Sequence, residues 1–168
     1  MTVQEILLLG NPKLYEVSEE VHETEIDLVQ RVVQDLHDTM MVFREEYGVG
    51  RAIAAPQIGV MKRIIYIHID RPVVFVNPVL RDLSREMIEL WDDCMCFPEL
   101  LVRVRRHRFC IIDYRDQHWR SQSMKLADDL SELLQHEYDH LEGILAVSRA
   151  IDGHSFSLTS QHELLQKS

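Results

Sequence analysis

Two histidines and a glutamate in the stretch QHEYDHLEGIL, residues 135–145, have the types and spacing of a metal-dependent hydrolytic site. His136 and His140 are four residues apart, so on an α-helix both imidazoles lie on one face and can reach one cation. Glu137 then lies beside that cation. A bound divalent metal lowers the pKa of its water to about 7, and a nearby carboxylate can take the proton. The HExxH pattern therefore predicts metal-assisted hydrolysis, with an acidic, solvated helix as the alternative.

A catalytic site of this kind needs a third protein ligand as well as an open position for water. In the longer pattern HExxHxxGxxH the third histidine would fall on Ala146, which has no donor atom. Two other sources remain open. Cys94 and Cys96 in WDDCMCF would point to the same face of an extended segment, and a thiolate ligand could come from there. Glu163, in a polar tail near the C-terminus, is the second possibility.

Length and composition predict one globular domain over residues 1–168, with a short polar C-terminal tail from about residue 153. The chain is 46% hydrophobic, enough for a sizeable core. A net charge of -10 argues against nucleic acid or an anionic membrane as a direct partner. The most basic run, RVRRHR at 103–108, alternates with apolar residues, so we expect its arginines on the solvated face of a strand.

We expect a soluble, cytoplasmic protein, because the sequence shows neither a signal peptide nor an apolar run that could span a membrane. Its three cysteines, an odd number, do not suggest a disulfide framework. Cys110, within the apolar run RFCIID, is expected to be a small buried residue without a chemical role.

The pattern of apolar residues predicts an α+β fold, in which mostly antiparallel strands pack around a C-terminal metal-binding helix. A long amphipathic helix is expected near the N-terminus, over residues 25–48. Short β-branched or alternating runs predict strands at 63–69, 73–80 and 86–91, followed by a strand pair or hairpin within 102–116. The metal motif lies on the last expected helix, within 126–145.

Three stretches together resemble, in order and spacing, the three motifs of the peptide deformylases. They are the glycine-containing loop YGVGRAIAAPQIGV, the CxxFPE segment that begins at Cys94, and QHEYDHLEGIL. Other matching stretches are ILLLGNPKLYEVSEEV, RIIYIHID and VVFVNPVL. The resemblance covers most of the chain and fades after about Asp152.

The resemblance implies a complete catalytic set. The metal ligands of the family map to Cys94, His136 and His140, and its general base maps to Glu137. Its oxyanion-stabilising groups map to the Gln57 side chain and the backbone N–H of Met95. The implied cofactor is one divalent metal per subunit, Fe²⁺ in the cell, with Zn²⁺, Ni²⁺ or Co²⁺ possible in purified protein. The implied reaction removes the N-formyl group from formyl-methionyl peptides or nascent chains and releases formate, with transient ribosome association.

Several positions depart from the usual family pattern. The second motif is usually Glu-Gly-Cys, an apolar residue and Ser, whereas here it reads DDCMC, residues 92–96. Ala52 stands where the family usually has a glycine, and Leu101 where it often has an arginine. We expect the substrate to contact five residues: Gly50, Ala52, Ile53, Asp93 and Leu133. The departures leave two alternatives, a metallohydrolase of the same fold acting on another N-acyl group or peptide bond, and a weakly catalytic metal-binding relative.

Overall fold

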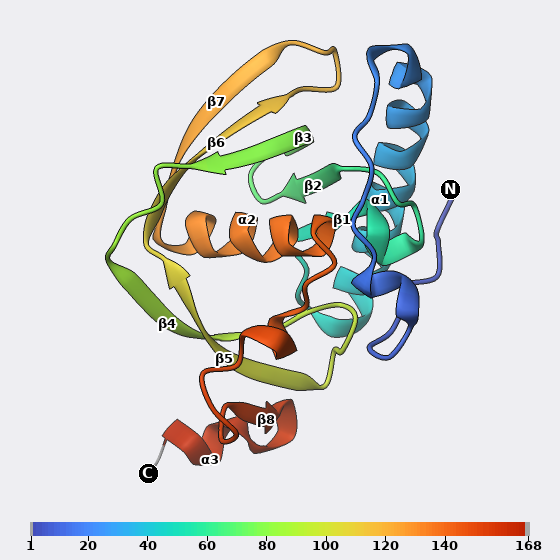
Figure 1. Ribbon diagram of the computed structural model, residues 1–168. Helices are drawn as coiled ribbons and strands as arrows, with labels where there is room; N and C mark the ends of the chain where they lie inside the picture. The colour runs from blue at the N-terminus through green and yellow to red at the C-terminus, as the bar shows by residue number, and fades with distance from the viewer. Residues whose placement is uncertain (1, 167–168) are drawn as a thin grey trace.

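A computed structural model describes residues 2–166, in which two antiparallel sheets lie on either side of helix α2 (Asp128–Leu141) (Figure 1). One sheet has the strand order β1-β2-β3-β6-β7 and the other the order β4-β5-β8. The strands of the first are β1 (Ala52–Ala54), β2 (Ile64–His68), β3 (Pro72–Arg81), β6 (Phe109–Arg115) and β7 (Ser121–Ala127). Those of the second are β4 (Met87–Asp92), β5 (Leu100–His107) and β8 (Phe156–Leu158). The α+β prediction, with antiparallel strands around a metal-motif helix, is confirmed.

The N-terminal part of the chain contains a 22-residue helix, α1 (Ile26–Tyr47), which packs on β1 and β2. Its buried side chains recur at helical spacing, from Val29 through Leu36 and Met40 to Phe43, and form a core with the first sheet. The helix ends at Gly48, whose φ of 71° reverses the chain and whose N–H donates to the Arg44 carbonyl. The chain then leads directly into β1.

Two boundaries of the predicted elements differ from the structure. The metal-motif helix begins at Asp128 rather than 126, because Leu126 lies in β7, an edge strand whose exposed, polar sequence SQSMKLA gave no strand signal. The run 102–116 does not form a hairpin. Only Arg108 separates β5 from β6, too little chain for a hairpin loop, and the two strands enter different sheets.

The segment after residue 153, expected to be a polar tail, contributes structure. Strand β8 pairs with β5, from Leu100 to Val102, and helix α3 (His162–Gln166) follows it at one end of the molecule (Figure 1). Short 3-10 helices complete the fold at Pro12–Tyr15, Glu23–Glu25, Ala55–Ile58, Ala146–Arg149 and Thr159–Gln161. No helix within residues 2–166 is long and apolar enough to cross a membrane.

Candidate metal centre

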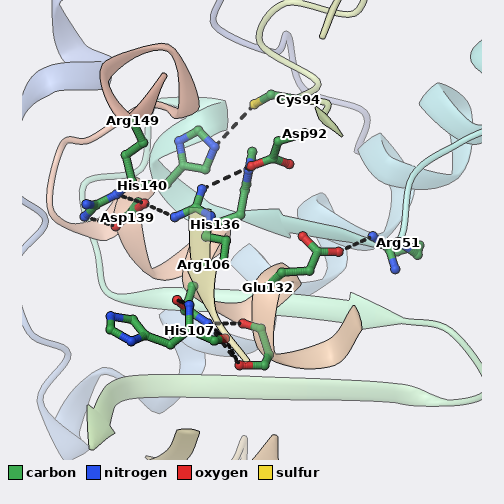
Figure 2. A network of polar contacts seen from close by, with 12 residues as sticks. Arg51, Asp92, Cys94, Arg106, His107, Glu132, His136, Asp139, His140 and Arg149 are labelled. Carbon is green, nitrogen blue, oxygen red and sulfur yellow. Dashed lines mark hydrogen bonds and ion pairs between the residues drawn. The ribbon is translucent and has the colours of Figure 1, made fainter. Parts of the chain in front are cut away.

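Helix α2 and the segment that follows β4 bring one thiol and two imidazoles together. The ligand atoms of Cys94, His136 and His140 all lie within 4.8 Å of one another, and the three side chains are buried. Cys94 Sγ lies 3.4 Å from His140 Nε2 (Figure 2). Glu163, the alternative third ligand, lies in the exposed first turn of α3 and is not part of this cluster.

A chain of ion pairs, buried except for Arg149 at its end, holds the first histidine in place (Figure 2). The ring atom Nδ1 of His136 lies 2.8 Å from a carboxylate oxygen of Asp92, which also accepts from Arg106 at 3.1 Å. Arg106 donates in turn to Asp139, which also pairs with Arg149. Because Nδ1 of His136 is occupied by Asp92, its Nε2 atom is left to bind a metal.

Arg106 corrects our expectation that the arginines of RVRRHR lie on a solvated face. Arg103 and Arg105 are partly exposed, but only 2% of Arg106 is accessible. Arg106 shares the inner face of β5 with Val102 and Val104, because side chains of a strand alternate between its faces. That parity was visible in the sequence, and it is the signal that could have identified Arg106.

The charges of the ligands are set by burial and by Asp92. Burial lowers the pKa of His136, but the Asp92 carboxylate outweighs this effect and raises that pKa to about 9. Burial, reinforced by His136, lowers the pKa of His140 well below its usual value, so this imidazole is neutral with a free lone pair. Burial raises the pKa of the Cys94 thiol. A cation must therefore displace protons from His136 and Cys94 as it binds.

Glu137 has the properties of a proton carrier beside the ligands. It is 3% exposed, and burial raises its pKa to about 7, with the nearby carboxylates of Asp92 and Asp93 adding to the effect and His136 opposing it. Its Oε2 atom is buried without a hydrogen-bond partner among residues 2–166. A carboxyl group with this pKa can both accept and return a proton near neutral pH.

The donor set fits a transition metal. A thiol and two imidazoles match Zn²⁺, Fe²⁺, Ni²⁺ or Co²⁺, whereas Ca²⁺ and Mg²⁺ prefer oxygen ligands. Glu137 Oε2 is buried and has no hydrogen-bond partner among residues 2–166. This unsatisfied oxygen agrees with a metal-bound water beside the ligands.

Gln57 and Met95 both lie close to the ligand Cys94, Gln57 through its side chain and Met95 as the next residue in the chain. Gln57 is buried in the 3-10 helix after β1; its Oε1 accepts from the Ala54 N–H, and its Nε2 lies 3.7 Å from Cys94 Sγ and 3.5 Å from Cys96 Sγ. The backbone N–H of Met95 donates to no other group in residues 2–166. Gln57 Nε2 is therefore near the candidate metal position, and the Met95 N–H directly follows a ligand in the chain.

The segment around Cys94 is a turn, contrary to the extended conformation that we expected for Cys94 and Cys96. The turn nevertheless keeps the two residues together, since the Cys96 N–H lies 3.5 Å from Cys94 Sγ and both sulfurs contact Gln57 Nε2. Cys96 is 1% exposed.

A cavity of about 460 Å³ opens beside the ligands. Four of the five expected substrate contacts line it: Gly50, Ala52, Asp93 and Leu133. Ile53 does not, because it follows Ala52 on the opposite face of β1 and is fully buried in the core under α1. Arg51, which our sequence analysis did not single out, does line the cavity and pairs with Glu132.

This combination, a buried Cys-His-His set with a buried glutamate at a cavity, is typical of a metal-dependent hydrolase. The family model for polypeptide deformylases matches residues 3–155 of the chain. The chain belongs to this family. A peptide deformylase from Parafrankia sp. (strain EAN1pec) is 38% identical over 151 residues, covering 89% of this chain and 79% of the relative.

Solved structures show the same fold. The Met-Ala-Ser-bound class I type b peptide deformylase from Acinetobacter baumannii has a TM-score of 0.81 at 26% identity, covering 89% of this chain and 99% of that one. The peptide deformylase from Synechococcus elongatus in complex with actinonin has a TM-score of 0.84 at 25% identity, covering 99% of this chain and 86% of that one.

Proposed function

We propose that this chain is a metal-dependent hydrolase that removes the N-formyl group from the N-terminal formyl-methionine of nascent peptides. The observation that carries the proposal is the buried cluster of Cys94, His136 and His140 with Glu137 beside it, in a chain of the polypeptide deformylase family. The related enzyme from Acinetobacter baumannii binds Met-Ala-Ser, which is the peptide that formyl-Met-Ala-Ser would leave.

Cys94, His136 and His140 would hold one divalent metal per subunit. Such a metal would polarise the formyl carbonyl and lower the pKa of water, so that a nucleophile would be available at neutral pH. We propose Fe²⁺ as the metal in the cell, with Zn²⁺, Ni²⁺ or Co²⁺ able to occupy the same ligands in purified protein.

The residues around the ligands transfer the proton and stabilise the negative charge that develops on the formyl oxygen. Glu137 accepts the proton lost by the attacking water and delivers it to the leaving amine, as the formyl C–N bond breaks and a C–O bond forms. Formate and a free N-terminus result. The Gln57 Nε2 group and the Met95 N–H donate to the formyl oxygen as it gains negative charge. Burial of these groups strengthens the interactions, because water competes little for them.

The two strands beside the cavity support binding of the peptide as an added strand. β1 and β4 are edge strands of their sheets, and Ala52 and Asp92 at their ends line the cavity. An extended peptide could use the unpaired backbone groups of these edges, while its first side chain enters the cavity near Leu133. The exposed carboxylate of Asp93 would border the entrance.

The natural substrates would be formyl-methionyl chains as they emerge from ribosomes. The proposal therefore implies a cytoplasmic enzyme that meets ribosomes transiently and needs neither a membrane nor direct contact with nucleic acid. The net charge of -10 agrees with the absence of a nucleic-acid role.

Formate release from formyl-Met-Ala-Ser by anaerobically prepared Fe²⁺ protein tests the proposal, with acetyl-Met-Ala-Ser and Met-Ala-Ser as controls. We expect formate from the first peptide alone. Faster cleavage of the acetyl peptide or of a peptide bond would favour a hydrolase of different specificity. Stoichiometric metal without turnover of any peptide would favour a metal-binding relative.

A further inference from the structure

One arginine that lines the cavity beside the metal ligands, Arg51, forms an ion pair with Glu132, which lies just behind the lining residues. Arg51 Nη2 lies 3.1 Å from Glu132 Oε1, and Figure 2 shows the two side chains pointing toward each other. Arg51 immediately precedes β1, while Glu132 lies one helical turn before His136 on α2. The pair thus connects the edge of the five-stranded sheet to the helix that carries two ligands.

Arg51 is the arginine of the cavity that a substrate can reach. Its side chain is 45% exposed, and within residues 2–166 it makes one side-chain hydrogen bond, to Glu132. Arg44 also lines the cavity, but its guanidinium donates to the carbonyls of Gly50 and His68. Most N–H groups of Arg51 therefore remain available to a group in the cavity.

Glu132 depends on Arg51 for its charge balance. Its side chain is 7% exposed; burial and the neighbouring Asp92 raise its pKa, and Arg51 opposes that shift. While the pair is intact, the two charges neutralise each other. Arg51, with its charge paired, and Leu133 then both line the cavity, which suits an uncharged, unbranched side chain such as methionine.

We propose that the Arg51–Glu132 pair determines specificity, by making the cavity select an uncharged first side chain in the formylated peptide. This inference rests on the proposed deformylase function. Removal of either charge leaves the other unpaired, Arg51 in the cavity wall or Glu132 just behind it, where it attracts a first side chain of opposite charge. Neither residue takes part in the hydrolytic step, so both act on the choice of substrate.

The test compares kcat/KM for formyl-Met-Ala-Ser, formyl-Glu-Ala-Ser and formyl-Lys-Ala-Ser. The variants are Glu132→Gln, Arg51→Met and the double variant. We expect Glu132→Gln to raise the Glu-to-Met ratio of kcat/KM by about tenfold or more, the scale of one charge-assisted hydrogen bond. Arg51→Met should raise the Lys-to-Met ratio, and the double variant should raise neither.

Ratios are the appropriate measure because Glu132 also contributes to the raised pKa of Glu137. A change in Glu137 alters the rates for all three peptides alike and cancels in the ratio. The matched control is the exposed pair Arg105–Glu89, whose atoms lie 2.8 Å apart away from the cavity. Arg105→Met and Glu89→Gln should leave both ratios as in the wild type.

Melting temperature and metal content establish that each variant is folded and carries its metal. If Arg51→Met is unstable, Glu132→Gln, which keeps the side-chain shape, tests the specificity proposal by itself. Ratios within about twofold of the wild type, with formyl-Met turnover intact, would overturn the inference and leave the proposed function standing. If no protein releases formate, the proposed function fails. In that case, calorimetry measures the affinities of the metal-loaded proteins for Met-Ala-Ser, Glu-Ala-Ser and Lys-Ala-Ser. The Glu-to-Met and Lys-to-Met ratios of affinity then test the inference.

Discussion

The Nδ1 atom of His136 and a carboxylate oxygen of Asp92 lie 2.8 Å apart, and both side chains are buried. A carboxylate in this position orients the imidazole and makes it a stronger metal ligand. Asp92 stands where the family usually has glutamate, and its shorter side chain nevertheless reaches the histidine. Arg106 shares the same carboxylate oxygen and holds it in place.

Asp92→Asn should therefore weaken metal binding. Loss of such a partner typically lowers metal affinity about 10- to 100-fold, and we expect that range in competition titrations with a chromogenic chelator. Asp93→Asn is the control, since Asp93 is adjacent but exposed and makes no contact with a ligand histidine. Equal affinities of the two variants would show that Asp92 does not support the metal.

Cys94→Ala should abolish stoichiometric metal binding, because two imidazoles alone are a poor site for a transition metal. The measurement is metal per subunit by elemental analysis after gel filtration. Glu163→Ala is the matched variant and should retain full metal, since Glu163 is exposed on α3 outside the ligand cluster. The reverse result would make Glu163 the third ligand.

Glu137→Ala should keep its metal and lose turnover. General acid–base catalysis typically contributes about 10²- to 10⁴-fold, so kcat should fall by at least that order. Asp129→Asn, an exposed acid on the same helix, should retain the wild-type kcat. An unchanged kcat in metal-loaded Glu137→Ala protein would remove this residue from the mechanism.

The metal-free protein should become less stable as pH rises above about 6.5, because below that value the lowered pKa of His140 adds stability with rising pH and opposes the loss from Glu137. Folding raises the pKa of Glu137 from 4.5 to about 7 and that of His136 from 6.5 to about 9. A group whose pKa is raised by folding contributes its full stabilisation at pH values below its pKa in the unfolded state. This contribution is lost as pH rises through its pKa in the folded state. The Glu137 contribution is therefore lost between 4.5 and about 7, and the His136 contribution between 6.5 and about 9.

Chemical unfolding in a chelator, from about pH 6.5 to about pH 9, measures this effect as a falling free energy of unfolding. Asp92→Asn should flatten the upper part of the profile, because the Asp92 carboxylate is what raises the pKa of His136. A metal-free wild type whose stability rose across this range would contradict the assignment.

The sequence predicted the parts of the site that follow from local spacing, such as the histidine pair on α2, and the family motifs supplied Cys94. It did not reveal contacts made across long separations. Asp92 and His136 are 44 residues apart, and Arg51 and Glu132 are 81 apart. Strand pairing has the same difficulty: the alternating run 102–116 shows that two strands exist but not that they enter different sheets.

Cys96 should protect the metal ligand Cys94 from irreversible oxidation. Both sulfurs contact Gln57 Nε2, so the two thiols lie together in the turn after β4. Peroxide converts a cysteine to a sulfenic acid, and a neighbouring thiol can condense with it to a disulfide and release water. A disulfide between residues i and i+2 is strained, so an intermolecular disulfide is the alternative product.

We therefore expect peroxide to inactivate the wild type reversibly, with dithiothreitol and fresh metal restoring formate release. Cys96→Ser lacks the second thiol, so its Cys94 should be oxidised further to sulfinic acid, which dithiothreitol does not reduce. Mass spectrometry distinguishes the two products. Cys110→Ser is the control, because Cys110 lies in β6, where its thiol contacts Ser131 instead of the ligands. Equally reversible inactivation of wild type and Cys96→Ser would mean that Cys96 serves packing alone, because a protective thiol must change the oxidation product of Cys94.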